Sequence, residues 1–319
     1  MKRVIEARAS TILFKFLINN QGLLRNGKFL LPANICPIIP VVFSKAKVFF
    51  EFLDISPQTQ SLDQDAVYSR IQRDPDTING VLFVHSYGYK QNISSLFKTI
   101  SIKWPEKILI DDQCSCIPDI NGESISKFSS LTLFSTGYAK HVEFGKGGFG
   151  FLGERAIYKD YREPFNELAH QQLVEQMKFA LSNDLPFKYQ DVAWLKFDQE
   201  FSEKDYFNKI KITIPEALKC KQRINRIYAE NLPSEIHLGS KFTWRFNLQV
   251  SNKEKILNKI FENGLFASSH YKPLSSVFGG EEAPVADRFY KRMINLFNDH
   301  RFNEEMAFSM CKIIKKNII

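Results

Sequence analysis

The segment LFSTGYAKHVEFGKGGFGFL, residues 133–152, places a strand, a lysine and several glycines close together. The apolar strand is expected to end at Ser135, a turn then holds Lys140, and four glycines follow. No Lys-Ser or Lys-Thr pair opens a helix after the glycines, so the segment is not a P-loop. A lysine beside glycines most often belongs to a hairpin with a solvated side chain. Its meaning therefore depends on the sequence upstream.

An acidic pair, Asp111–Asp112, follows the strand KILI at residues 107–110. A buried carboxylate at a strand end needs a cationic partner, because an unpaired one would take up a proton instead. A protonated pyridine nitrogen is such a partner. On local grounds an equally good alternative is that the two acids cap the following turn.

Short apolar strands alternate with helical segments through the first half of the chain. Such alternation predicts a parallel sheet with helices on both faces, whose ligands gather at the carboxyl ends of the strands. His85, the acidic pair and Ser135 fall at those ends. Helices are expected at 9–17, 63–71 and 93–102, and strands at 29–32, 47–53, 81–85, 107–110 and 131–134.

The second half of the chain reads as α+β. We expect a helix at 165–183, a long helix starting near Pro215, a strand at 242–250, a helix at 253–263 and two helices within 283–316. The stretch 184–209 has no clear pattern. These elements predict a large α/β domain over residues 1–212 and a smaller C-terminal domain over residues 213–319.

Composition excludes several classes of protein. The 319 residues are 44% hydrophobic and 24% charged, as in globular domains. No apolar run is long enough to span a membrane, and the start MKRVIEARAS lacks the apolar core of a secretory signal. Five scattered cysteines suit the reducing cytoplasm, and Cys114 and Cys116 have no second ligand pair, so no metal site is expected.

The net charge of +8 does not indicate a nucleic-acid partner. The 43 basic residues are interspersed with 35 acidic ones, and no long basic block is present. The excess of positive charge suits an anionic small molecule better.

The order of these motifs resembles that of the pyridoxal 5'-phosphate (PLP)-dependent sugar aminotransferases of the DegT/DnrJ/StrS family. The resemblance extends from about Glu6 to Lys312 and implies a fold-type-I, aspartate-aminotransferase-like architecture. In that family the second acid of the pair contacts the pyridine nitrogen of PLP, which assigns this role to Asp112. The position near the ring hydroxyl, usually Gln or His, is Ser115 here.

The segment quoted first gives the most specific match. In the family a strand ends in a serine that holds the cofactor phosphate, and the Schiff-base lysine lies five residues later, ahead of a Gly-Gly strand start. Ser135, Lys140 and Gly147–Gly148 have this spacing. The resemblance therefore assigns the phosphate contact to Ser135 and the covalent attachment of PLP to Lys140.

Flanking segments add further candidates. EARASTILFKFL resembles the helix whose first N–H groups bind phosphate, which indicates Ala9 and Ser10. In two departures, Cys36 lies where many relatives place an aromatic residue against the ring, and no Asn-Arg stretch in 151–208 matches the one that in relatives reaches the partner subunit's phosphate. The candidate substrate contacts are His85, Arg245, His270 and Tyr271.

The resemblance implies an aminotransferase that moves an amino group, for example from glutamate, to a nucleotide-linked keto sugar in polysaccharide biosynthesis. It also implies a homodimer in which each subunit completes the other's site. An alternative is a PLP-dependent sugar dehydratase, in which histidine replaces the Schiff-base lysine. Another is a non-catalytic family member that acts as a binding or assembly partner. The presence of Lys140, Asp112 and Ser135 favours the aminotransferase over both.

Overall fold

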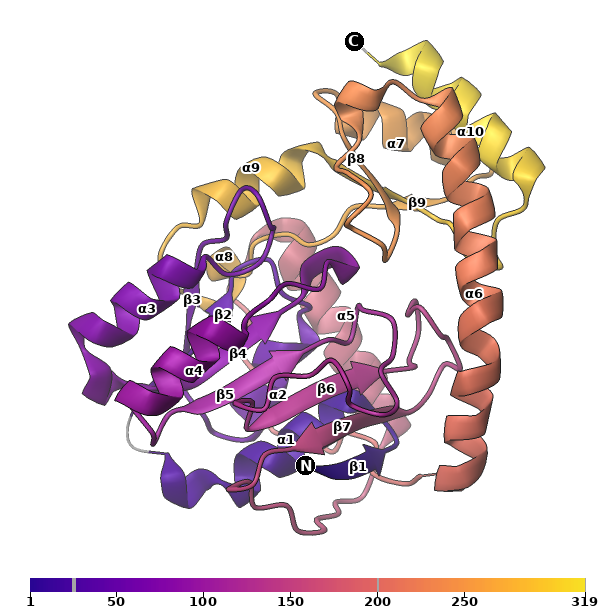
Figure 1. The fold of residues 1–319 in the computed structure, drawn as a ribbon. Helices are drawn as coiled ribbons and strands as arrows, with labels where there is room; N and C mark the ends of the chain where they lie inside the picture. Colours follow the sequence, from indigo (N-terminus) through magenta and orange to yellow (C-terminus); the bar gives the residue numbers. More distant parts are fainter. Residues whose placement is uncertain (25–26, 200, 319) are drawn as a thin grey trace.

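A computed structural model describes residues 1–24, 27–199 and 201–318. Its centre is a seven-stranded sheet in the order β1-β7-β6-β5-β4-β2-β3 (Figure 1). The strands β2 to β6 pair in parallel, whereas β7 is antiparallel to both of its neighbours. This is the mainly parallel sheet that the sequence predicts. The strands are β1 Lys2–Glu6, β2 Lys28–Pro32, β3 Phe50–Leu53, β4 Ile78–Val84, β5 Ile108–Asp112, β6 Leu131–Ser135 and β7 Gly148–Leu152.

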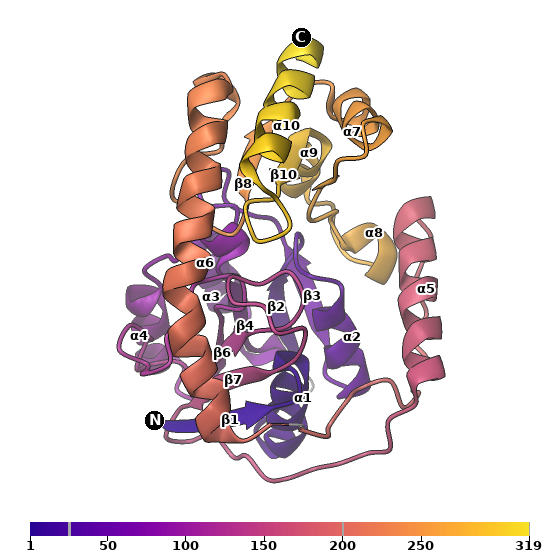
Figure 2. The ribbon, with the colours of Figure 1, turned by 90° about the vertical axis from the view of Figure 1, so that its right-hand side faces the viewer.

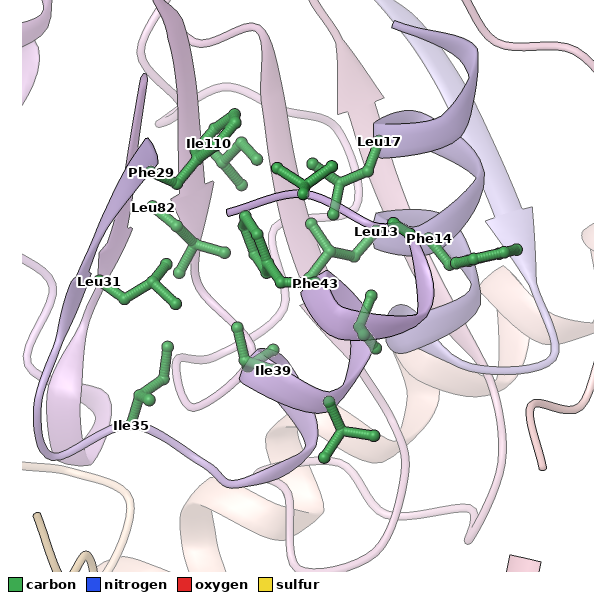
Figure 3. Close-up of a cluster of buried hydrophobic side chains, with 14 of the residues drawn as sticks. Leu13, Phe14, Leu17, Phe29, Leu31, Ile35, Ile39, Phe43, Leu82 and Ile110 are labelled. Atoms are coloured by element: carbon green, nitrogen blue, oxygen red, sulfur yellow. The ribbon is translucent and has the colours of Figure 1, made fainter. Parts of the chain in front are cut away.

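The strand residues alternate between two apolar layers. On one face, Ile108 and Ile110 of β5 join the cluster that includes α1 (Ala9–Asn19) and α2 (Ile38–Lys45). On the other face, Leu109 joins the cluster that includes α3 (Gln64–Arg73) and α4 (Ser94–Lys103). Figure 3 shows Leu13 and Phe43 of the two helices against strand side chains of the first face. Because successive strand side chains point to opposite faces, each strand end also presents two different environments.

A smaller unit lies beyond the carboxyl end of the central sheet. It contains the antiparallel sheet β8-β10-β9, covered by α7 and α10 (Figures 1 and 2). This confirms the expected α+β character of the C-terminal part. The remaining elements are α5 Glu167–Asn183, β8 Phe246–Gln249, α7 Lys253–Glu262, β9 Ala267–Ser268, α8 Ser275–Phe278, α9 Pro284–Arg292, β10 Met293–Leu296 and α10 Glu304–Asn317.

The long helix α6, Glu203–Asn231, connects the two units (Figure 2). Its first turns pack Tyr206 and Ile210 beside β6 and β7, and its last turns pack Ile224 and Tyr228 in the small unit. The proposed division between residues 212 and 213 falls inside this helix and stays a prediction.

The expected start of α6 near Pro215 was wrong. The helix begins at Glu203, directly after Ser202, whose hydroxyl accepts the N–H of Asp205, and Pro215 lies in its interior. A proline is favoured in the first helical turn and therefore indicates a helix start, but here packing of both ends of α6 maintains the helix around it. The sequence interpretation also did not identify β1, α2, α8, β9 or β10, and β10 separates the two helices expected within 283–316. Within the residues that the structure describes, no helix is long and apolar enough to cross a membrane.

Candidate active site

A cavity of about 1060 Å³ lies where the carboxyl ends of β5 and β6 meet the small unit. Its wall includes Asp112 from β5, Ser135 from β6 and Ala9 from the start of α1. The small unit contributes Arg245 and the segment 268–272. The lining contains six basic side chains and two acidic ones, so the cavity favours an anionic ligand. The basic residues are Arg8, Lys140, Lys178, Lys196, Arg245 and Lys272, and the acidic ones are Asp112 and Glu167.

Asp112 is a buried carboxylate without a cation beside it. It is 6% exposed, and its Oδ1 accepts the backbone N–H of Cys114 at 2.8 Å. Among the described residues no lysine, arginine or histidine forms an ion pair with it. A buried carboxylate is costly without a positive partner. The cavity therefore has a place for a cationic group at Asp112.

Lys140 lies in the turn between β6 and β7 and lines the same cavity. Within the described part of the chain its ammonium group has neither a hydrogen bond nor an ion pair. The preceding residue, Ala139, has the left-handed backbone angle φ = 58°, which is uncommon for a residue with a side chain. An amine without a partner in a cavity is available to react with a carbonyl compound.

Contacts from the small unit hold the turn of Lys140 in place. The indole N–H of Trp244 donates to the carbonyl oxygen of Ala139 at 2.6 Å, and the N–H of Ala139 donates to Glu143 at 2.9 Å. Glu143 also forms an ion pair with Arg301, which pairs with Asp299 at 2.8 Å. The sequence analysis did not identify these partners of the turn, because they act through contacts between distant segments. They are Trp244, Glu143, Arg301 and Asp299.

The start of α1 faces the cavity together with the end of β6. Ala9 and Ser10, the first residues of the helix, line the cavity, as does Ser135. Their position depends on Gly148, because a Cβ at that glycine would lie 2.2 Å from the nitrogen of Ala9. The Gly-Gly start of β7 thus allows the strand to pass directly against the helix start. N–H groups at a helix N-terminus and a serine hydroxyl are suitable donors to a phosphate group.

The candidate substrate contacts in the small unit differ in their surroundings. Burial, together with the nearby charge of Arg245, lowers the pKa of His270 to about 4, so the ring is neutral at pH 7. Its Nδ1 has no hydrogen-bond partner among the described residues. Tyr271 contacts the thiol of Cys36, and both residues line the cavity.

Arg245 lines the cavity but is 2% exposed and already paired. Its guanidinium forms an ion pair with Asp299 and lies 3.7 Å from the ring centroid of Phe297. A second guanidinium, that of Arg301, shares Asp299. These contacts indicate a structural ion pair in the cavity wall, and the substrate contact expected for Arg245 stays a prediction.

Two of the ten predicted site residues lie away from the cavity wall. His85 is 1% exposed, and its Nε2 lies 2.9 Å from Oδ1 of Asp111 on the other face of the sheet. It lines a separate polar cavity of about 260 Å³. Ser115 is half-buried in the loop after β5 and does not line the large cavity. The roles proposed for both residues therefore have no geometric support.

The described residues contain no cluster of three or more His, Cys, Asp or Glu side chains suited to a metal ion. All five cysteines are free thiols. The donor set of the large cavity, a carboxylate, an amine and a helix start, fits an organic cofactor with a cationic ring, a carbonyl group and a phosphate.

Comparisons with solved structures agree with this architecture. An aminotransferase of Helicobacter pylori, PseC, involved in the biosynthesis of pseudoaminic acid, is 14% identical and has a TM-score of 0.72 over 100% of this chain and 87% of its own. A DegT DnrJ EryC1 StrS aminotransferase of Brucella abortus is also 14% identical, with a TM-score of 0.69 over 99% and 86%. The GDP-4-keto-6-deoxy-D-mannose-3-dehydratase of E. coli, with bound hydrated PLP, is 13% identical, with a TM-score of 0.66 over 98% and 87%.

No family model matches the sequence, and no curated protein sequence matches it. The structural likeness nevertheless shows that the chain has the fold of PLP-dependent transferases of the aspartate-aminotransferase type. It confirms, at the level of fold, the resemblance to the DegT/DnrJ/StrS family that the sequence indicates.

Proposed function

We propose that the protein is a PLP-dependent aminotransferase that transfers an amino group, for example from glutamate, to a nucleotide-linked keto sugar. One observation supports this above the others. The unpaired carboxylate of Asp112, the unpaired amine of Lys140 and the start of α1 all line one cavity. Each of these groups matches one charged or reactive part of PLP.

When bound, PLP supplies an aldehyde and an electron-withdrawing ring. Asp112 would hold the proton on the pyridine nitrogen, because a buried carboxylate stabilises a neighbouring cation. Ser135 and the first N–H groups of α1, at Ala9 and Ser10, would hold the phosphate and so fix the orientation of the ring.

Lys140 has two roles in this proposal. Its Nζ is the amine that attaches the cofactor to the chain. As a free amine, the same Nζ would move a proton between the substrate carbon and the cofactor, in opposite directions in the two half-reactions. The turn contacts from Trp244 and Glu143 keep this amine at the cavity wall.

The nucleotide-linked sugar is proposed because the cavity is large and its lining is predominantly basic. Lys178 on α5 lines the cavity and would offer countercharge to a diphosphate, whereas Lys272 of the small unit is paired with Asp184 at 2.7 Å. The occurrence of sugar aminotransferases among the structural neighbours, together with a neighbour solved with its TDP-sugar product, supports the same substrate class.

A sugar dehydratase is the second candidate, because an E. coli dehydratase shares the fold. In the dehydratase hypothesis a histidine replaces the lysine that attaches the cofactor. The neighbouring histidine, His141, is 5% exposed, hydrogen-bonds Thr243 at 3.2 Å and does not line the cavity. The geometry therefore supports the aminotransferase.

We further propose a homodimer that acts in the cytoplasm. The fold resemblance supports a symmetric pair of subunits with shared active sites, and the five free thiols support a reducing compartment. Light scattering at assay concentration tests the dimer. A fully active monomer would contradict it.

The function is tested by spectroscopy and peptide mapping. The protein is incubated with PLP, its absorption is recorded before and after borohydride, and the modified peptide is identified by mass spectrometry. We expect the label on Lys140, no label in Lys140→Ala, and an unchanged label in the control Lys146→Ala, whose lysine lies in the same loop outside the cavity wall. Turnover is then measured with glutamate and nucleotide-linked keto sugars. Absence of PLP binding would support a non-catalytic binding protein instead.

A further inference from the structure

Arg8 is a cavity residue for which the proposed mechanism so far has no use. It is the N-cap residue of α1, and its half-buried side chain lines the large cavity beside Ala9. Among the described residues, no acidic group pairs with it and no hydrogen bond uses its guanidinium. In contrast, Arg245 in the same lining has Asp299 as its partner. Arg8 is therefore a permanent positive charge free to bind an anion.

The backbone of Arg8 is fixed by the start of β7. Arg8 forms a parallel bridge with Gly147, and the N–H of Gly147 donates to the carbonyl oxygen of Ala7 at 2.7 Å. The absence of a side chain at Gly148 allows this close approach. The start of the Arg8 side chain is thus held by the sheet, which reduces the conformational freedom lost on binding.

The guanidinium of Arg8 lies close to the end of β6. A Cβ placed on Gly137 would be 3.2 Å from the hydroxyl oxygen of Ser135 and 3.7 Å from Nη1 of Arg8. The Ser135 oxygen accepts the N–H of Gly137 at 3.1 Å, so its own hydrogen remains available to a ligand. Serine, guanidinium and helix start therefore face one region of the cavity.

The chemistry of this region matches a phosphate monoester. A dianion gains from the partial positive charge of the helix N-terminus and from N–H donors that cannot lose their proton. The same cavity contains the unpaired Asp112, which is 6% exposed and calls for a cationic group on the same ligand. A ligand with a phosphate at one end and a protonated ring nitrogen satisfies both requirements.

We propose that Arg8 binds the phosphate group of the cofactor from within the same subunit. This inference rests on the proposed function. It gives the phosphate a countercharge from the same subunit, in a chain whose segment 151–208 lacks the Asn-Arg stretch that in the DegT/DnrJ/StrS family reaches the partner subunit's phosphate.

The test compares ligands with and without the phosphate. The cofactor-free full-length protein is titrated with PLP and with pyridoxal, which lacks the phosphate, and binding is followed by absorption. Inorganic phosphate serves as a competitor. The variants are Arg8→Ala and Arg8→Lys, with Arg73→Ala as the control because Arg73 is exposed on α3 outside the cavity.

We expect Arg8→Ala to weaken PLP binding by about 10- to 100-fold, the usual range for a lost charge-assisted hydrogen bond. Pyridoxal binding should stay within about twofold of wild type, and inorganic phosphate should compete less well. Arg8→Lys should fall between, because an ammonium retains the charge without the planar donor pair. Arg73→Ala should bind as wild type.

The outcomes separate the two proposals. If wild-type protein binds PLP and Arg8→Ala binds it equally well, the role of Arg8 is refuted and the proposed function stands. If Arg8→Ala weakens PLP and pyridoxal equally, Arg8 acts on the fold rather than on the phosphate, which also refutes the inference. If wild type binds neither ligand, the proposed function fails and the assignment of Arg8 fails with it.

Discussion

Asp111 and Asp112 are consecutive residues of β5, and their side chains point to opposite faces of the central sheet. Asp111 is hydrogen-bonded to His85 at 2.9 Å and to Gln113 at 2.8 Å, on the face of α3 and α4. Asp112 faces the large cavity, where the described residues leave it without a cation. The alternation of strand side chains thus divides the acidic pair into one internally satisfied acid and one available to a ligand.

This division predicts different effects for the two conservative variants. Asp112→Asn should retain PLP but lose at least about a hundredfold in turnover, because an amide cannot hold the ring proton by charge. Turnover and the absorption of the bound cofactor at several pH values measure this effect. Thermal unfolding should change little.

Asp111→Asn is the matched control, and its cost should appear in stability. Because Nδ1 of His85 accepts the N–H of Gln91, the ring proton lies on Nε2 and is donated to Asp111. The variant replaces a charge-assisted hydrogen bond by a neutral one, with a loss of about 1–3 kcal/mol in the free energy of unfolding. The register of the pair would be wrong if Asp111→Asn abolished turnover while Asp112→Asn only lowered stability.

The turn of Lys140 gives a second prediction. Trp244→Phe removes the indole donor to the carbonyl oxygen of Ala139 and keeps most of the ring volume. We expect a loss of about 1–3 kcal/mol in stability and slower attachment of PLP, because Lys140 is less well positioned. The rate is measured by stopped-flow absorption after mixing with PLP. The control is Tyr138→Phe, which changes an exposed aromatic residue of the same turn and so reports general effects of altering it.

An unchanged attachment rate in Trp244→Phe would show that the turn holds Lys140 without the indole donor of Trp244. In that case the ion pair between Glu143 and Arg301 would be the remaining link between the turn and the C-terminal part. A double-mutant cycle with Glu143→Gln and Arg301→Met measures that coupling directly.

The sequence was sufficient for the parts of the site that depend on local spacing. The end of β6 at Ser135, the start of β7 at Gly148 and the position of Lys140 between them follow from a short segment, and the structure places them as expected. The roles of Trp244 and Arg301 could not be predicted, because they depend on how the small unit packs against the turn. No local pattern marks such a contact.

The start of α6 and the place of His85 show two other limits. Local propensity favours a helix start at a proline, but packing against β6 and β7 extends α6 to Glu203. His85 follows a strand end, as a ligand residue would, yet strand alternation directs it to the face of α3 and α4. The sequence indicated the correct edge of the sheet but not the face.

Buried Lys221 predicts a pH-dependent stability. Its ammonium donates to the carbonyl oxygen of Trp244 and to Asn298, both at 2.8 Å. Burial, followed by the charge of Arg245, lowers its pKa from 10.5 to about 7. Between these values the unfolded chain binds more protons than the folded one, so the contribution of Lys221 to stability rises with pH from about 7 to 10.5.

The corresponding experiment uses Lys221→Met, which removes the titrating group. In this pH window the free energy of unfolding of wild type should gain a rise of up to about 1.4 kcal/mol per pH unit from Lys221. Lys221→Met should not show this rise. Denaturant unfolding from pH 7 to 10 measures the difference. The control is Lys219→Met, at an exposed position two residues earlier on α6, and its pH profile should follow that of wild type. Parallel pH profiles for wild type and Lys221→Met would contradict the assignment.

The last prediction concerns Arg245 and the class of acceptor. If Arg245 were a clamp for a substrate carboxylate, its guanidinium would have to leave Asp299 or bind both groups, and either step is costly for a side chain that is 2% exposed. We therefore expect Arg245→Met to lower the free energy of unfolding by about 1–3 kcal/mol, because it removes a charge-assisted hydrogen bond to Asp299, which keeps Arg301 as a partner. Denaturant unfolding measures this loss. Wild type should aminate nucleotide-linked keto sugars and leave simple keto acids, other than the one formed from its own amino donor, unreacted as acceptors. Turnover of simple keto acids alone, lost in a stably folded Arg245→Met, would show instead that Arg245 is a carboxylate clamp and that the sugar is not the substrate.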